Sequence, residues 1–313
     1  PRIARIWFRP YPNFGAALIG FKEGEVHGLG HIPTDRVAEV QQVPGAQIHR
    51  QTLARYSLLI LNTQSPLLDK PQTRQAIEFA IDRKSLISQA LQGQAALAYS
   101  PVLSQSWAYN PSTPHREHDP AEARRLLDAA GWVMGPTGVR ARQGVTLTLV
   151  LAANKEAPAN VAVAQQIAGQ LREVGIDSKL ALVSRDTLLR DYLAPRAFHI
   201  VLASWEAQGG DPDVQDYWHS PRPGGGGLNF SGWSNTQADR SLETALLTLD
   251  VGSRATEYAT FQDTFAQDVP GVILYDPVYT YATRPPAGGA RVPTTDLLNP
   301  AYRFDTIGNW YLK

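Results

Sequence analysis

The most constraining feature of the sequence is a strand, helix and strand pattern in its middle. Val145–Leu151 is a short apolar run, Val161–Val174 carries apolar side chains at helical spacing, and Asp177–Val183 follows shortly after Gly175. Two strands joined by such a helix form a parallel pair, because a parallel connection requires a crossover of a dozen or more residues. The sequence therefore predicts a mixed α/β fold.

Elements of both kinds are also predicted on either side of this unit. Alternation predicts a strand over Arg2–Phe8, and Gly24 ends a helix predicted over Phe14–Lys22. Asp119-Pro120 supplies an N-cap and a first-turn proline for a helix that stops at Gly131. Further helices are predicted after Pro71, after Asp82 and over Val37–Val43, Thr187–Leu193, Gln237–Leu249 and Arg254–Gln267, and further strands over Gln47–His49, Ser57–Leu61, Phe198–Ala203, Val272–Tyr275 and Val278–Thr283.

Length and composition exclude several classes of function. At 313 residues with 43% hydrophobic content, the chain exceeds one ordinary domain, and two lobes are expected. Acidic and basic side chains number 29 each, so no net field attracts nucleic acid or an anionic surface. The absence of cysteine removes disulfides, thiolate metal sites and cysteine nucleophiles.

The sequence shows no targeting or membrane-spanning segment. No apolar run approaches the ~18–20 residues that cross a bilayer, and no basic start leads into an apolar signal-peptide core. The chain begins at Pro1 and not at methionine, so we expect a processed protein or a fragment of a longer one.

Four stretches carry a family resemblance in the same order along the chain. They are Leu61-Asn62-Thr63 with Pro66, Thr73–Ile77 and Ala80-Ile81-Asp82-Arg83; Asp119–Trp132, which reads DPAEARRLLDAAGW; Trp205 with Asp211-Pro212-Asp213; and Asn229 with Ser234-Asn235 and Asp239. Together they resemble the bacterial oligopeptide- and dipeptide-binding proteins, the family 5 solute-binding subunits of ABC importers. The Ala17 to Glu25 stretch and the tail Phe304–Lys313 are similar to the same family.

The resemblance implies a two-lobed α/β fold of the periplasmic-binding-protein kind (type II), with the first lobe incomplete. Residues 1–62 and 270–313 would belong to the first lobe and residues 63–269 to the second, with hinge crossings between them. It also implies an extracytoplasmic protein, periplasmic or a cell-surface lipoprotein, that binds a small peptide and delivers it to an ABC permease. No enzymatic activity, cofactor, metal or nucleic-acid partner is expected.

Five residues are the candidate ligand-binding residues. Trp205 ends a buried strand and precedes a polar turn, so its indole can form an aromatic wall of a ligand site. The same position is also typical of a tryptophan that only packs in the core or at its rim. In peptide-binding relatives an aspartate three positions after this tryptophan pairs with the ligand's ammonium, whereas this chain has Gln208, which cannot neutralise a cation. Asp211 and Asn229 are candidates for polar contacts, and Arg190 for a ligand carboxylate.

Other interpretations stay open at this point. Gln208 also fits an oligosaccharide or another non-peptide solute, and the same fold serves as the ligand-sensing module of some regulators. Asp211 fits turn chemistry better than ligand binding, because an Asp-Pro-Asp run more often caps the next helical turn. His115, Glu117 and His118 can be read as a metal cluster or as solvated loop residues. No Gly-x-Ser-x-Gly elbow supports nucleophilic catalysis.

Overall fold

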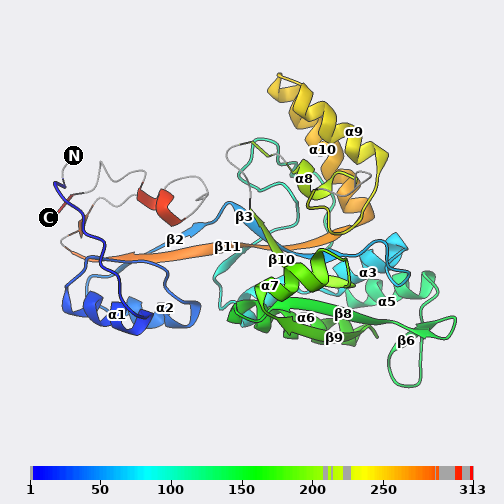
Figure 1. Ribbon diagram of the computed structural model, residues 1–313, viewed down its shortest axis with the longest axis horizontal. Coiled ribbons are helices and arrows are strands. Elements are labelled where there is room, and N and C mark those ends of the chain that lie inside the picture. The colour runs from blue at the N-terminus through cyan, green and yellow to red at the C-terminus, as the bar shows by residue number, and fades with distance from the viewer. Residues whose placement is uncertain are drawn as a thin grey trace. The chain divides into compact units, whose positions relative to one another are not determined.

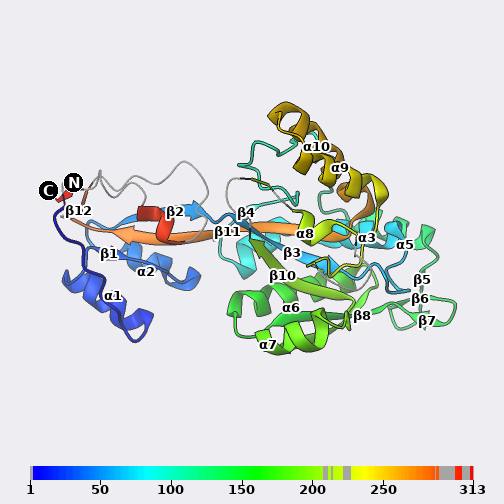
Figure 2. The ribbon, with the colours of Figure 1, turned by 45° about the horizontal axis from the view of Figure 1, so that its top comes forward.

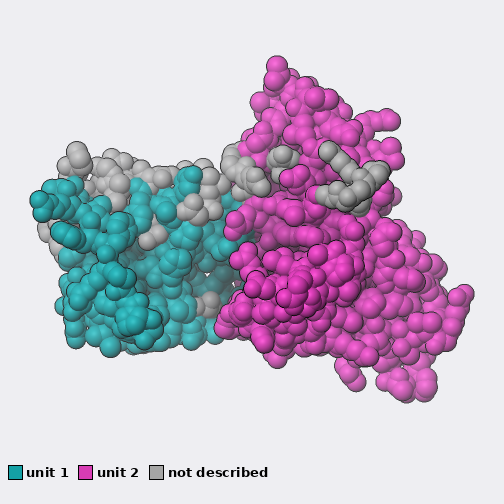
Figure 3. Space-filling model, viewed as in Figure 1, with its two compact units in different colours: residues 1–55, 91–96, 276–313 teal, residues 56–90, 97–275 magenta. Residues whose placement is uncertain are grey.

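The computed structural model forms two compact units, distinguished by colour in Figure 3. Unit 1 comprises residues 1–55, 91–96 and 276–313, and unit 2 comprises residues 56–90 and 97–275. The structure describes residues 3–206, 211–212, 214–220, 227–285, 287–288, 300–304 and 311–312. No helix in these described ranges is long and apolar enough to cross a membrane.

Unit 2 is built on the predicted parallel sheet. The strands β8 (Thr148–Asn154) and β9 (Asp177–Val183) pair in parallel, and β10 (Ile200–Glu206) pairs with β8 in the same direction. The helix α6 (Pro158–Glu173) is the crossover and packs against β8 and β9, as Figure 1 shows. The strand-helix-strand prediction is therefore confirmed.

The remaining elements of unit 2 extend this sheet and cover it. The sheet continues from β10 to β3 and then to the first part of β11, which is antiparallel to β3. A helical hairpin of α9 and α10 projects from the unit in Figures 1 and 2. The other elements are β3 (Arg55–Leu61), α3 (Pro71–Ala80), α4 (Arg83–Ser85), the π-helical turns η2 (Leu86–Ala90) and η3 (Leu188–Leu193), α5 (Pro120–Ala129), β5 (Val133–Met134), β6 (Arg140–Arg142), β7 (Val145–Thr146), α7 (Arg185–Thr187), α8 (Gln215–Trp218), α9 (Thr236–Leu247) and α10 (Val251–Asp268).

An apolar core links the sheet of unit 2 to its helices. It includes Leu58 and Ile60 of β3, Val201 of β10 and Phe261 of α10, all at most 1% exposed. Because β3 is buried along almost its whole length, its sequence is largely a continuous apolar run and does not alternate between apolar and polar residues. The core therefore joins the sheet to the α10 helix.

Unit 1 is organised around the second part of β11 (Gly271–Thr283). There β11 pairs antiparallel with β1 and β2, and it also pairs with β4. The helices α1 and α2 pack with this part through a small core that contains Leu18, Phe21 and Val40. The other elements of unit 1 are α1 (Phe14–Glu23), β1 (Gly28–Leu29), η1 (Thr34–Arg36), α2 (Val37–Gln41), β2 (Gln47–Thr52), β4 (Ala95–Leu97), β12 (Ala287–Gly288), η4 (Pro300–Phe304) and β13 (Tyr311–Leu312).

Two sequence predictions about the elements are wrong. Residues 3–10 form no strand, and Trp7 and Phe8 are 81% and 73% exposed, because alternation by itself supplies no partner strand. The two strands predicted over Val272–Tyr275 and Val278–Thr283 are one strand, β11, whose pairing with β3 shifts register between Ile273 and Tyr275.

Candidate ligand-binding site

The carboxyl end of β10 carries a cluster of three aromatic rings. Trp205 stacks on Tyr217 of α8, with ring centroids 4.8 Å apart and an interplanar angle of 9°. The Phe230 ring lies 6.0 Å from the Trp205 ring. Since β8, β9 and β10 are parallel, this cluster lies at the edge of the sheet where α/β folds usually bind ligands.

The indole nitrogen of Trp205 is an unsatisfied donor. Its Nε1 atom is buried, and no acceptor for it exists among the residues that the structure describes. A buried indole N–H normally donates to an acceptor, and leaving one unpaired costs about 1–3 kcal/mol. An orphaned donor at the carboxyl edge of a sheet is a reason to look for an oxygen that a ligand supplies.

Tyr217 and Phe230 were not candidates from the sequence. Tyr217 is brought to Trp205 by α8, and its hydroxyl donates to the Glu206 carbonyl oxygen at 3.3 Å. Neither residue belongs to a motif or to a periodic pattern that would have singled it out. The sequence of a short helix that follows a polar turn does not indicate which of its side chains will pack against the end of the preceding strand.

The candidate residue Gln208 lies outside the described residues. Its role in the site therefore stays a prediction from the sequence.

Asp211 has a partner within the protein. Both of its carboxylate oxygens accept hydrogen bonds from Nη2 of Arg254 in α10, at 2.7 Å and 2.9 Å. The same bond is the main cause that raises the pKa of Arg254 above its ordinary value. The negative charge of Asp211 is thus already compensated, and the carboxylate is poorly suited to bind a ligand ammonium as well.

The side chain of Asn229 braces the loop in which it lies. Asn229 is 4% exposed, and its Nδ2 donates to the carbonyl oxygens of His219 and Trp233 at 2.8 Å and 2.9 Å. Its Oδ1 accepts from Ser231 Oγ and from the Gly232 amide at 2.7 Å and 3.1 Å. These four bonds engage both ends of the amide and favour a structural role close to Phe230.

Arg190 lies on the surface of unit 2. Its side chain is 70% exposed, and Nε donates to Asp191 at 2.7 Å while Nη2 donates to the second carboxylate oxygen at 2.8 Å. This ion pair raises the pKa of Arg190 and lowers that of Asp191. The structure brings Arg190 into no contact with the aromatic cluster among the described residues.

A pocket of about 510 Å³ lies elsewhere in unit 2, lined in part by Tyr99, Glu117 and Asp82. Burial and the hydrogen bond from its hydroxyl to Glu117 raise the pKa of Tyr99 to about 12. Lys84 pairs with the same carboxylate at 3.2 Å, and Asp82 accepts the Ser85 amide at 2.9 Å. Tyr99 and Lys84 thus both engage the Glu117 carboxylate, and Asp82 caps α4.

The histidines beside this pocket do not assemble into a metal site. His115 Nε2 lies 3.8 Å from Glu117, and His118 Nδ1 lies 3.9 Å from Asp82. Within the described ranges, no group of three or more metal-ligating side chains is placed to hold an ion.

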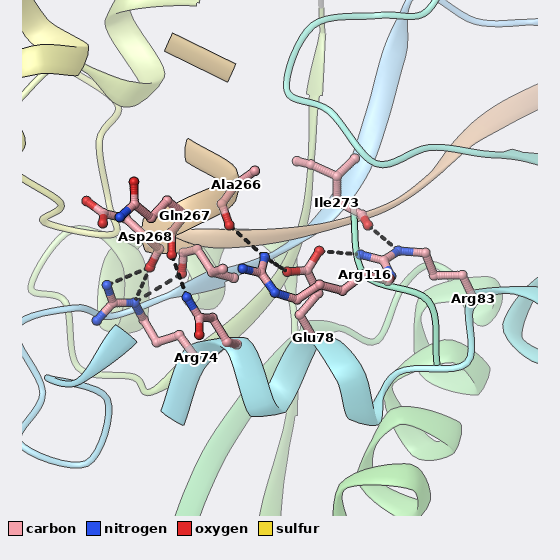
Figure 4. A network of polar contacts seen from close by, with 10 residues as sticks. Arg74, Glu78, Arg83, Arg116, Ala266, Gln267, Asp268 and Ile273 are labelled. Atoms are coloured by element: carbon pink, nitrogen blue, oxygen red, sulfur yellow. Dashed lines mark hydrogen bonds and ion pairs between the residues drawn. The ribbon is translucent and has the colours of Figure 1, made fainter. Parts of the chain in front are cut away.

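The arginines of the Thr73–Ile77 and Ala80–Arg83 stretches form a buried polar network, drawn in Figure 4. Arg74 donates to the Asp268 and Val269 carbonyl oxygens at the end of α10. Glu78 bonds Arg83 at 3.1 Å and Arg116 at 2.9 Å. These residues contact backbone and one another, so the motif that carried the resemblance is largely a packing motif.

The same network satisfies the last turn of α10. Side chains donate to four successive carbonyl oxygens: Arg116 to Ala266, Gln75 to Gln267, and Arg74 to Asp268 and Val269. Carbonyl oxygens at a helix end lack intrahelical donors, and these side chains supply the missing donors. From there Arg83 reaches the Ile273 carbonyl oxygen of β11 at 2.7 Å.

Comparison with known proteins places the chain in a family. Residues 1–225 match the family model described as bacterial extracellular solute-binding proteins, family 5 middle. The chain is 25% identical over 281 residues to the oligopeptide-binding protein AppA of Bacillus subtilis, an alignment that covers 88% of the chain and 51% of that protein. It is 27% identical over 193 residues to the nickel-binding periplasmic protein of Escherichia coli, covering 58% of the chain and 35% of that protein.

Solved structures share the fold. The structure of Bacillus subtilis AppA in complex with a nonapeptide is 24% identical with a TM-score of 0.79, covering 97% of this chain and 59% of that one. The substrate-binding protein CtaP of Listeria monocytogenes is 21% identical with a TM-score of 0.83, again covering 97% and 59%. The expected α/β fold of two-lobed binding proteins is thereby confirmed.

The chain spans about half the length of the curated relatives that it matches. The family model nevertheless covers residues 1–225, which is well over half of the chain. This protein belongs to the bacterial extracellular solute-binding proteins of family 5.

Proposed function

We propose that the protein to which this chain belongs is the solute-binding subunit of an ABC importer and that its ligand is a peptide. The observation that carries the proposal is the orphaned indole N–H of Trp205 in the aromatic cluster at the end of β10. The rings supply apolar walls, and the N–H supplies a donor for a ligand carbonyl oxygen. A relative named oligopeptide-binding protein and a structure with a bound nonapeptide support the peptide class.

In this proposal the protein makes and breaks no bond. It acts outside the cytoplasm and presents its ligand to a membrane permease. Residues 63–269 form the second lobe, and residues 1–62 with 270–313 form part of the first. Trp205 and Gln208 contact the ligand, whereas Asp211 and Asn229 hold the surrounding segments in place.

A second candidate is a non-peptide solute such as an oligosaccharide. Two features favour it: position 208 is a neutral glutamine, and the nearby Asp211 carboxylate is engaged by Arg254. A peptide ammonium would therefore need another acid as its partner, whereas sugar hydroxyls bond to amides and carbonyls without one.

A thermal-shift screen followed by calorimetry tests both candidates. The purified protein is scanned with di- to pentapeptides, with malto- and cello-oligosaccharides and with Ni²⁺. A ligand at 100 times its dissociation constant stabilises the folded state by about 2.7 kcal/mol. We expect shifts with peptides. Shifts with sugars alone would replace the peptide by the second candidate, and shifts with no solute of either class would refute solute capture by this site.

A further inference from the structure

Arg254 of α10 contacts three separate segments of unit 2. Its Nη2 holds both carboxylate oxygens of Asp211, and its Nε donates to the Ala245 carbonyl oxygen of α9 at 3.0 Å. The guanidinium carbon lies 4.9 Å from the centroid of the Trp107 ring. The Arg254 side chain is 16% exposed, so this charged group is largely enclosed by its partners.

The geometry fixes the guanidinium in one orientation. A planar fork that lies over an indole and is already bonded through Nε loses little further freedom when its Nη2 binds a carboxylate. Asp211 is 52% exposed and receives its position from this contact. The pair therefore ties Asp211 to the end of the α9–α10 hairpin, although the two residues are 43 positions apart.

Asp211 lies between the two elements that carry the stacked rings. Trp205 is on β10, which ends at Glu206, and Tyr217 is on α8, which begins at Gln215. The chain that joins them passes through Asp211. A fixed Asp211 therefore restricts where α8 can place Tyr217 against Trp205.

We propose that Arg254 is a positioning residue for the candidate ligand-binding site. By binding Asp211, it keeps the Trp205 and Tyr217 rings in their stacked arrangement. The role in binding rests on the proposed function, but the role in placing the rings does not. Asp211 acts as a latch in this scheme and contributes no charge to the ligand.

Nuclear magnetic resonance reads the ring placement without any ligand. The protein has seven tryptophans, and the variant W205F assigns the indole N–H resonance of Trp205 in a spectrum of the ¹⁵N-labelled chain. The variants D211N and R254M each release the latch, since one removes the negative charge and the other removes the donors. The control R125Q removes an equally short pair with Glu122 that links no separate elements.

We expect D211N and R254M to move the Trp205 resonance in the same direction in the free protein, and R125Q to leave it unchanged. Calorimetry with trialanine supplies the binding readout: each latch variant weakens binding by about tenfold, equal to about 1.4 kcal/mol, and the double variant D211N/R254M loses no more than either single one.

Two results would overturn the inference. One is a Trp205 resonance that stays in place in D211N, and the other is a double variant whose losses add, since additive effects mean that the two side chains act separately. Wild-type protein that binds no peptide in the screen would instead count against the proposed function, and the resonance shift would still decide the latch.

Discussion

Replacing Glu78 by glutamine is expected to destabilise unit 2 strongly. The Glu78 carboxylate is 9% exposed and pairs through one oxygen with Arg83, which is 3% exposed, and through the other with Arg116, which is 20% exposed. Glutamine keeps the shape of the side chain but removes its charge. Two guanidinium groups then face an amide, and the more deeply buried one, Arg83, loses its carboxylate partner.

The magnitude follows from burial. Removing one partner of a buried ion pair typically costs 3–5 kcal/mol, because the remaining charge stays desolvated without compensation; we therefore expect about 3–5 kcal/mol for E78Q. The hydrogen bonds from Arg83 to the Ile273 and Arg116 carbonyl oxygens persist and keep the loss within this range. At roughly 2–4 °C per kcal/mol for a unit of this size, the unfolding temperature falls by about 6–20 °C.

Differential scanning calorimetry measures the loss, and hydrogen exchange at the last turn of α10 shows whether that turn opens first. The matched control is E122Q, which removes an exposed pair with Arg125 of similar length and should leave the scan almost unchanged. If E78Q unfolded within about 2 °C of the wild type, the buried Arg83 and Arg116 charges would need no compensation by Glu78, and the expected cost would be wrong.

Two further predictions test the packing and the pH response of unit 2. At Gly175 (φ +88°) an added Cβ would lie 2.8 Å from Met134 Cε, so G175A should lower the free energy of unfolding by about 2 kcal/mol. The control is G169A in α6, where an added Cβ would have no atom within 4 Å. This variant should raise the free energy of unfolding by about 0.5–1 kcal/mol, and thermal unfolding measures both changes. Burial lowers the pKa of His199 below 6.5, and Nδ1 of its neutral ring accepts the Val150 amide at 3.0 Å. The stability that this neutral ring contributes is therefore present above about pH 6.5. It is lost as the pH falls towards the pKa of His199 in the folded protein. Thermal scans at about pH 7.5 and pH 5 should show a smaller loss for H199N than for the wild type, because an amide oxygen accepts the same bond at both pH values; an equal loss would contradict this role.

Helix ends with a strong local signal were predictable from the sequence. The Asp119 side chain accepts the Ala121 and Glu122 amides at 3.0 Å each, as an N-cap should, and Pro120 occupies the first turn of α5. At the end of α1, Gly24 adopts the left-handed conformation with φ +83°. Such signals depend on residues within one turn of each other, and that is why they can be read locally.

Strand pairing was harder to predict. Separate strands were predicted over Val272–Tyr275 and Val278–Thr283, yet β11 continues through Pro277, whose carbonyl oxygen accepts the Leu53 amide at 2.9 Å. Proline is tolerated in a strand where its missing N–H is not needed for the ladder. The strands β5 and β6 are only two or three residues long, too short for any periodic pattern, and the one strand predicted over Val145–Leu151 is divided between β7 and β8.

The candidate site was predictable only in part. Trp205 was identified because it ends a buried strand before a polar turn, and the structure places it at the carboxyl edge of the parallel sheet. Its partner Tyr217 and the engagement of Asp211 by Arg254 depend on contacts between distant segments. The Asp-Pro-Asp turn favoured a structural role for Asp211, but no local pattern in the sequence encodes those contacts, so its partner Arg254 could not be predicted.

In the proposed function, a peptide supplies the missing acceptor for the Trp205 indole N–H. Titration of the ¹⁵N-labelled protein with the peptide that gives the largest thermal shift tests it most directly, with calorimetry on the same samples. We expect the Trp205 indole resonance to move downfield as the site fills and W205F, which keeps an aromatic ring but lacks the donor, to bind more weakly. Peptide binding that leaves this resonance unmoved and W205F affinity unchanged would contradict it.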